Sequence, residues 1–207
     1  MLNPSWMSTR RLRFAWGAGL LSTLDPAAGM VRGTVAVMHD PASGHTPLLL
    51  EGNLGLEPLR VDHAVEMVAA LAHPGLYVFM GGSPPSLEDL KWRYEMQANG
   101  SRRADEHWHN WIIRDEAGDA MGYVQASVEG AHADIAWVVG MPWQGHGVAQ
   151  AATRAMCRWL RDEGVQLIEA HIHPEHFASA RVAACCELKF TGVMDDDGED
   201  VWRWTAQ

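Results

Sequence analysis

The pattern of apolar and polar residues along the chain changes near Leu54. After that point, runs in which apolar and polar residues alternate give way to runs with helical spacing, and turns rich in Gly, Asp and Asn separate them. The clearest helix spans 147–163, because apolar residues recur there every three or four positions and Gly164 follows as a stop. The remaining predictions are strands at 55–60, 108–114, 120–128, 132–140, 166–172, 189–194 and 201–204, helices that begin at Asp62 and Ser86, and a helix at 177–186.

Local signals define where several of these elements begin and end. Asp62 is predicted to cap the first helix, and Ser86 with Asp89 has the form of a capping box. The short gaps between the three central strands predict antiparallel hairpins, and Asp197-Gly198 predicts another. Because hairpins and crossover helices occur in one chain, the pattern predicts an α+β (mixed α/β) fold with a mixed sheet covered by helices.

The domain organisation follows from the same pattern. Residues 1–30 are interpreted as a tail or extension, and 31–207 as a single domain with its core at 54–204. Within the early part of that domain, 34–38 and 46–50 are predicted to form a small strand pair. The chain has 207 residues, 47% apolar and 20% charged, which is enough to bury a sizeable core and is unlike a disordered protein.

Charge and cysteine content narrow the class of function. The formal net charge of −10 argues against a general nucleic-acid partner and modestly favours small cationic substrates such as amines. The three cysteines, Cys157, Cys185 and Cys186, are odd in number and include no C-x-x-C pair, so we expect no disulfide framework and a reducing, cytoplasmic environment. No apolar run approaches the ~20 residues of a transmembrane helix, so no membrane partner is expected.

The segment 137–149 carries the most specific chemistry. A strand ends there, Pro142 interrupts it, a glycine-rich turn follows, and a helix begins. Such a turn directs several backbone N–H groups toward one space, and the helix N-terminus adds partial positive charge. This arrangement can hold a diphosphate without a lysine. A Walker loop is absent, and a Rossmann fingerprint would need a third glycine where Gln150 stands.

Two motifs resemble the GNAT superfamily of N-acetyltransferases. Gln144-x-x-Gly147-x-Ala149 is similar to the acetyl-CoA signature [RQ]-x-x-G-x-[GA] and follows a strand, as it does in that family. The segment 173–183 is similar to a second signature, H-P-x-N-x-x-S-x-x-V-A, which is typical of a subgroup resembling ribosomal-protein alanine acetyltransferases. The resemblance covers about 54–204. It implies a mostly antiparallel sheet that splays open between two parallel strands.

The resemblance also implies how acetyl-CoA, the co-substrate, is bound. The backbone of Val138 and Val139 is expected to pair with the pantetheine arm. His176 stands where the family usually has Asn and can still donate or accept a hydrogen bond, while Ser179 stands where a helix residue touches the cofactor. The backbone amides expected to hold the pyrophosphate are those of Gln144, Gly145, His146, Gly147, Val148 and Ala149.

In the family an amine attacks the thioester directly, so a base is needed to keep the amine neutral. Asp134, on the strand that leads to the splay, is the first candidate for this base, and Glu106 is the second. The Val139 N–H is the positional candidate for stabilising the oxyanion. The Tyr that often serves as general acid is replaced by Ala183, which leaves the thiol of Cys185 or Cys186 as a donor or the thiolate to leave unaided.

Three questions stay open at this point. The acceptor is expected to be a primary amine, either a protein N-terminus or a small molecule, and the sequence leaves a homodimer open. A non-catalytic acyl-CoA binder or sensor is the alternative, because the tyrosine is missing and the Asn is altered. His171-x-His173 with His176, and His107-x-His109, have spacings seen in metal sites, but no cysteine or carboxylate completes a recognised pattern, so no metal is expected.

Overall fold

The computed structural model describes residues 45–207, so the predicted strand at 34–38 and the extension at 1–30 lie outside it. The strands are β1 (Leu49–Glu51), β2 (Leu54–Pro58), β3 (Glu106–Arg114), β4 (Ala120–Glu129), β5 (His132–Val139), β6 (Leu167–Ile172), β7 (Lys189–Met194) and β8 (Asp200–Thr205). The α-helices are α1 (Ala64–Ala70), α2 (Tyr77–Met80), α3 (Leu87–Asn99), α4 (Val148–Asp162) and α5 (Phe177–Cys185). Three short 3-10 helices are η2 (Val61–His63), η3 (Pro74–Leu76) and η4 (Met141–Trp143).

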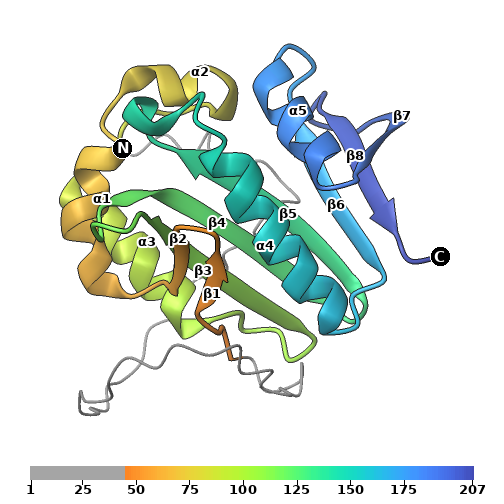
Figure 1. The fold of residues 1–207 in the computed structure, drawn as a ribbon, viewed down its shortest axis with the longest axis horizontal. Helices are drawn as coiled ribbons and strands as arrows, with labels where there is room; N and C mark the ends of the chain where they lie inside the picture. Colours follow the sequence, from red (N-terminus) through yellow and green to blue (C-terminus); the bar gives the residue numbers. More distant parts are fainter. Residues whose placement is uncertain (1–44) are drawn as a thin grey trace.

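The strands form one sheet in the order β1-β2-β3-β4-β5-β6-β8-β7. Every neighbouring pair is antiparallel except β5 and β6, which run parallel and are joined by the crossover helix α4. Only three residue pairs, from His132↔Leu167 to Asp134↔Glu169, connect these two strands. Beyond them β5 and β6 diverge (Figure 1), which confirms the expected mixed, splayed sheet.

Helices cover both faces of the sheet. Strand β3 shows the division, because Trp111 and Ile113 pack toward α4 in one core, whereas Ile112 packs with α1 and α3 in the other. This alternation is the period of two that a strand imposes on its side chains. None of the helices among residues 45–207 combines the length and apolar content that a membrane crossing requires.

One arginine links the C-terminal end of helix α4 to the residue that follows α5 and to strand β8. The Arg161 guanidinium donates a 2.7 Å hydrogen bond to the Cys186 carbonyl and stacks 4.3 Å from the centre of the Trp204 ring on β8. Its other amine group pairs with Glu187 at 3.0 Å. These contacts lie at the C-terminal end of α4, close to the end of the sheet where β5 and β6 are still paired.

Most predicted elements are confirmed, and the exceptions have local causes. Ser86 and Asp89 form the reciprocal capping box that starts α3. Asp62 does not cap the first α-helix, because its carboxylate pairs with Arg60 and it lies inside η2 instead. The strand predicted at 46–50 is shorter and begins at Leu49, and the sequence pattern missed η3 and α2.

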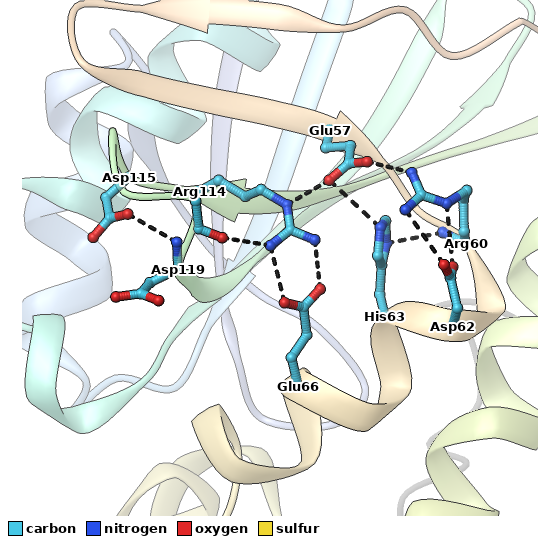
Figure 2. Close-up of polar contacts among 9 residues, drawn as sticks. Glu57, Arg60, Asp62, His63, Glu66, Arg114, Asp115 and Asp119 are labelled. Atoms are coloured by element: carbon cyan, nitrogen blue, oxygen red, sulfur yellow. Dashed lines mark hydrogen bonds and ion pairs between the residues drawn. The ribbon is translucent and has the colours of Figure 1, made fainter. Parts of the chain in front are cut away.

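A partly buried ionic network joins α1 to strands β2 and β3 (Figure 2). Arg114 binds Glu57 and Glu66, and it also donates a 2.7 Å hydrogen bond to the Gly118 carbonyl. Arg60 binds the other oxygen of Glu57, and the buried His63 ring lies 3.5 Å from the same carboxylate. Burial raises the pKa of Glu57, but hydrogen bonds from both arginines outweigh it and bring the value to about 2. Burial lowers the pKa of His63.

Gly122 permits the close contact between β4 and the end of β5. A Cβ atom at this position would lie 2.1 Å from the Val138 carbonyl oxygen and 2.9 Å from the Val139 Cα. Both are backbone atoms, so neither can move aside as a flexible side chain does. Glycine is therefore required here for β5 to reach the turn that follows it.

We expect Gly122→Ala to lower the free energy of unfolding by at least about 2 kcal/mol, or roughly 5 °C in Tm, because the new methyl group overlaps backbone. The matched control is Gly55→Ala on β2, where the atom nearest to the added methyl group would be a Leu50 side-chain carbon at 4.0 Å. Thermal unfolding of both variants checks this. Equal stability of the two would contradict the close contact.

The ionic network predicts a loss of stability in acid. His63 is neutral when folded, so stability falls as the pH drops below about 6.5, where the unfolded chain binds a proton more readily. Glu57 contributes stability above its unfolded pKa of 4.5 that is lost as the pH falls toward about 2. Chemical denaturation of Glu57→Gln between pH 7 and pH 3 should show a weaker pH dependence than the parent. Glu51→Gln, which removes an exposed pair with Arg158, should leave the parent's profile in place.

Candidate functional site

The turn after β5 is tightly organised. Gly140 donates a 2.8 Å hydrogen bond to the Met121 carbonyl, and a Cβ there would lie 2.7 Å from the Ala70 carbonyl. The chain then forms η4, and the Gln144 side chain donates a 2.9 Å hydrogen bond back to the Val139 carbonyl. Gln144 thus fixes the start of the glycine-rich turn to the end of β5. Its own N–H donates to the Met141 carbonyl at 3.3 Å.

The turn leads into a helix whose N-terminus has no side-chain cap. Gly145 and Gly147 adopt left-handed backbone angles, φ 77° and 80°, which glycine adopts without steric cost. Gly147 is the N-cap of α4, and no side chain accepts from the helix amides. Within the described part of the chain, no hydrogen bond is made by the N–H groups of residues 145–150. Six consecutive donors at the positive end of a helix dipole are suited to an anion such as a diphosphate.

The splayed strands lie directly beside this turn. Beyond the Asp134↔Glu169 pair, no ladder connects 135–139 of β5 with 170–172 of β6 among the described residues. Val138 packs toward α1 and α3 and Val139 toward α4, so both side chains are buried on opposite faces. The backbone edge of β5 that faces β6 is therefore open to an extended ligand. This open edge includes Val138 and Val139, the two residues predicted to pair with the pantetheine arm.

The N-terminus of α5 forms the other side of the opening. His176 caps this helix, because its Nδ1 accepts a 3.1 Å hydrogen bond from the Ser179 N–H. Phe79 of α2 lies edge-on to the His176 ring at 4.5 Å and also contacts His173 at 5.1 Å. The Phe79 side chain of helix α2, a helix that the sequence pattern missed, thus contacts the residues that begin α5. Burial lowers the pKa of His176, so its ring is neutral near pH 7.

The two candidate carboxylates share one face of the sheet. Asp134 lies at the last rung between β5 and β6 and pairs in register with Ser127 of β4. The Ser127 hydroxyl donates a 2.6 Å hydrogen bond to Glu106, and Ser101 donates one of 2.7 Å to its other oxygen. Burial raises the pKa of Glu106, but these hydrogen bonds outweigh it and lower the value below the ordinary range. Glu106 is thus held in its ionised form and is a poor proton acceptor.

The third candidate lies elsewhere. Cys185 is the last residue of α5, exposed, whereas the opening is at the first turn, about 13 Å away along the helix. It borders a small cavity with Arg154 and Arg158 of α4, on the outer side of the helix pair. Cys186 and Ala183 are buried in the core. The structure therefore brings Asp134 and Glu106 together on one face through Ser127, whereas the turn begins at the other end of the open edge of β5, about 16 Å away. It does not bring Cys185 to either place.

A cavity of about 570 Å³ opens on the same face as Glu106. Its buried wall includes Gln97 of α3, which donates hydrogen bonds to Asn110 at 3.1 Å and Gln125 at 3.3 Å. The signal available in the sequence was the alternation on β3, where Glu106, Trp108 and Asn110 occupy every second position. Alternation of this kind places all three side chains on one face of a strand.

Comparisons with known proteins agree with this geometry. A family model described as an acetyltransferase (GNAT) domain matches residues 53–189. No match was found among curated protein sequences. The structure is similar to that of an aminoglycoside acetyltransferase in complex with coenzyme A, with a TM-score of 0.62 and 19% identity, covering 74% of this chain and 95% of that one.

Two further solved structures have the same fold. A ribosomal L7/L12 α-N-protein acetyltransferase in complex with coenzyme A has a TM-score of 0.66 and 16% identity, covering 77% of this chain and 98% of that one. A GNAT-family acetyltransferase from Bacillus anthracis has a TM-score of 0.66 and 13% identity, with the same coverage of 77% and 98%. The splayed sheet, the uncapped helix after β5 and the family match together show that this chain belongs to the GNAT acetyltransferase family.

Proposed function

We propose that the protein is an acetyl-CoA-dependent N-acetyltransferase that transfers an acetyl group to a primary amine. The observation that supports this most strongly is the set of unpartnered N–H groups at 145–150, placed where β5 and β6 diverge. A diphosphate bound there directs its pantetheine arm along the open edge of β5. The thioester then reaches the rung at Asp134, on the face that also carries the large cavity.

In this proposal Asp134 accepts a proton from the acceptor ammonium, directly or through water, so that the neutral amine attacks the thioester carbonyl. The Val139 N–H, the positional candidate from the sequence for stabilising the oxyanion, lies about 16 Å from Asp134 along β5. That is too far to serve a thioester at the Asp134 rung, so we assign no oxyanion donor. The nitrogen of the tetrahedral intermediate loses its extra proton to water, and the intermediate collapses to the amide and releases CoA as a thiolate. Because Ala183 is buried and Cys185 lies at the far end of α5, we assign no general acid, and the thiolate leaves unaided.

The acceptor is proposed to enter through the cavity beside Glu106. Its wall mixes amide side chains with the Trp108 ring and the Glu106 carboxylate, groups that suit an amine with polar substituents. Structures with the same fold are described as acting on aminoglycosides and on a ribosomal protein α-amine. Parallel screens of N-terminal peptides and small polyamines, with release of free CoA as the readout, separate these two classes.

We expect Gly147→Asp to weaken acetyl-CoA binding by roughly tenfold or more (about 1.4 kcal/mol), because it adds a negative charge at the anion site and strains a left-handed residue. Gly52→Asp is the matched control, since Gly52 also has positive φ (57°), has open space around it and lies in the β1–β2 turn. Isothermal titration with acetyl-CoA measures both. Unchanged affinity in Gly147→Asp would show that the cofactor site is elsewhere.

We expect Asp134→Asn to lower kcat by about 100-fold or more while the affinity for acetyl-CoA stays close to that of the parent, because only proton transfer is removed. Asp162→Asn, at the far end of α4, is the control outside the site and should keep full activity. Steady-state kinetics with the best acceptor from the screen provide the test. Tight cofactor binding without acceptor-dependent CoA release in the parent protein would instead favour the non-catalytic acyl-CoA sensor.

A further inference from the structure

A cluster of histidine and carboxylate side chains lies at the last paired rungs of β5 and β6. His132 and Asp134 lie two residues apart on β5, and Glu169 is the register partner of Asp134 on β6. Their neighbours Ala133 and Ile168 face the α4 core, so these three side chains project from the opposite face. Because paired strands hold the backbone of all three residues, their Cα positions are fixed relative to one another.

From this cluster we infer that His132, Asp134 and Glu169 form a binding site for a divalent transition-metal ion of the zinc class. Asp134 contributes its Oδ1 to this site, so its Oδ2 stays outside the site and remains the oxygen for the proton transfer proposed above. One ligand atom from each residue lies within 4.8 Å of the other two. The His132 Nε2 is 2.9 Å from Glu169 Oε2 and 3.7 Å from Asp134 Oδ1. Around a tetrahedral zinc ion with bonds near 2.0–2.2 Å, ligand atoms are separated by about 3.3 Å, which lies between these two distances.

The contact between His132 and Glu169 lacks the geometry of a hydrogen bond. The His132 Nε2 atom is shielded from solvent yet makes no hydrogen bond to any described residue, although the Glu169 oxygen is only 2.9 Å away. These two atoms form an ion pair and lie close enough together for one cation to contact both. Arg203 occupies the other Glu169 oxygen at 2.6 Å and so orients Oε2 toward His132.

A second histidine extends the cluster in the manner of known metal sites. The His171 Nε2 lies 3.6 Å from the same Asp134 oxygen, while its Nδ1 lies 2.7 Å from the Asp195 carboxylate. A carboxylate on the distal nitrogen orients a histidine and raises its basicity as a ligand. His171 is therefore the nearest side chain for a fourth ligand position, with water as the alternative.

The charge of the cluster suits a divalent cation. Asp134, Glu169 and Asp195 carry three negative charges, and Arg203 supplies one positive charge, which leaves −2 when both imidazoles are neutral. Neutral imidazole is the form that binds a metal. A bound ion of charge +2 would neutralise this group. The mixed nitrogen and oxygen ligands favour zinc or a related transition metal over calcium or magnesium, which prefer oxygen alone.

The test is direct binding of Zn²⁺ to the full chain, and it does not depend on acetyl transfer. Isothermal titration and competition with a chromophoric chelator should show one ion per chain, and Co²⁺ should give the visible absorption of a four-coordinate site. His132→Gln and Glu169→Gln should each weaken binding at least about tenfold. His107→Gln, a histidine on β3 outside the cluster, should bind as the parent does.

The thermal stability of each metal-free variant is measured first, so that a folding defect is separated from a lost ligand. If Glu169→Gln is destabilised through Arg203, the partly exposed His132 still provides the test. Absence of Zn²⁺ binding at 100 times the protein concentration would overturn the proposal. Binding of the same strength and stoichiometry in the parent and in both cluster variants would overturn it equally.

Discussion

The short parallel pairing of β5 with β6 is the constraint on which the rest of the molecule depends. Three residue pairs hold the two halves of the sheet together at one end, and the strands separate after Asp134. The separation exposes the backbone edge of β5, and it leaves room for the turn at 140–147 and for α5 on either side. Without the divergence the uncapped N-terminus of α4 would face a closed sheet in place of an open backbone edge.

Charged side chains cluster where β5 and β6 are still paired. On one face of the last rung, strand alternation places Asp134 beside Glu169, and His171 reaches across from the next position outward. Two carboxylates in register on adjacent strands repel each other unless cations separate them. The positive charge of Arg203 offsets part of that repulsion, and the His132 and His171 rings offset more of it in their protonated forms. The chemistry of the site is thus a consequence of where the ladder stops.

Local signals predicted most of the fold, because they act through neighbours in the sequence. The capping box of Ser86 and the apolar stripe of α4 depend on residues three or four positions apart, and both were predicted correctly. Asp62 failed as a cap because Arg60, which no helix pattern includes, competes for its carboxylate. The turn after β5 was likewise predicted from local signals, Pro142 and the glycines that follow it, while its role in binding acetyl-CoA came from the family resemblance and stays a prediction. The placement of Cys185 and the cluster around His132 required the tertiary structure, since they depend on helix orientation and on pairing between strands 35 residues apart.

The contacts of Arg161 concern the end of the sheet at which β5 and β6 are paired. The arginine holds α4 against Cys186 and the Trp204 ring at the end where β5 and β6 are paired, and the opening lies at the other end. The unpaired edge of β5 from Asp134 to Val139 is about 16 Å long. A rotation of this edge by roughly 5° about its paired end would displace Val139 by about 1.4 Å. A shift of that size is enough to misalign reacting atoms. If the protein has the proposed function, the position of the cofactor along β5 therefore depends in part on side chains at the paired end, which do not touch it.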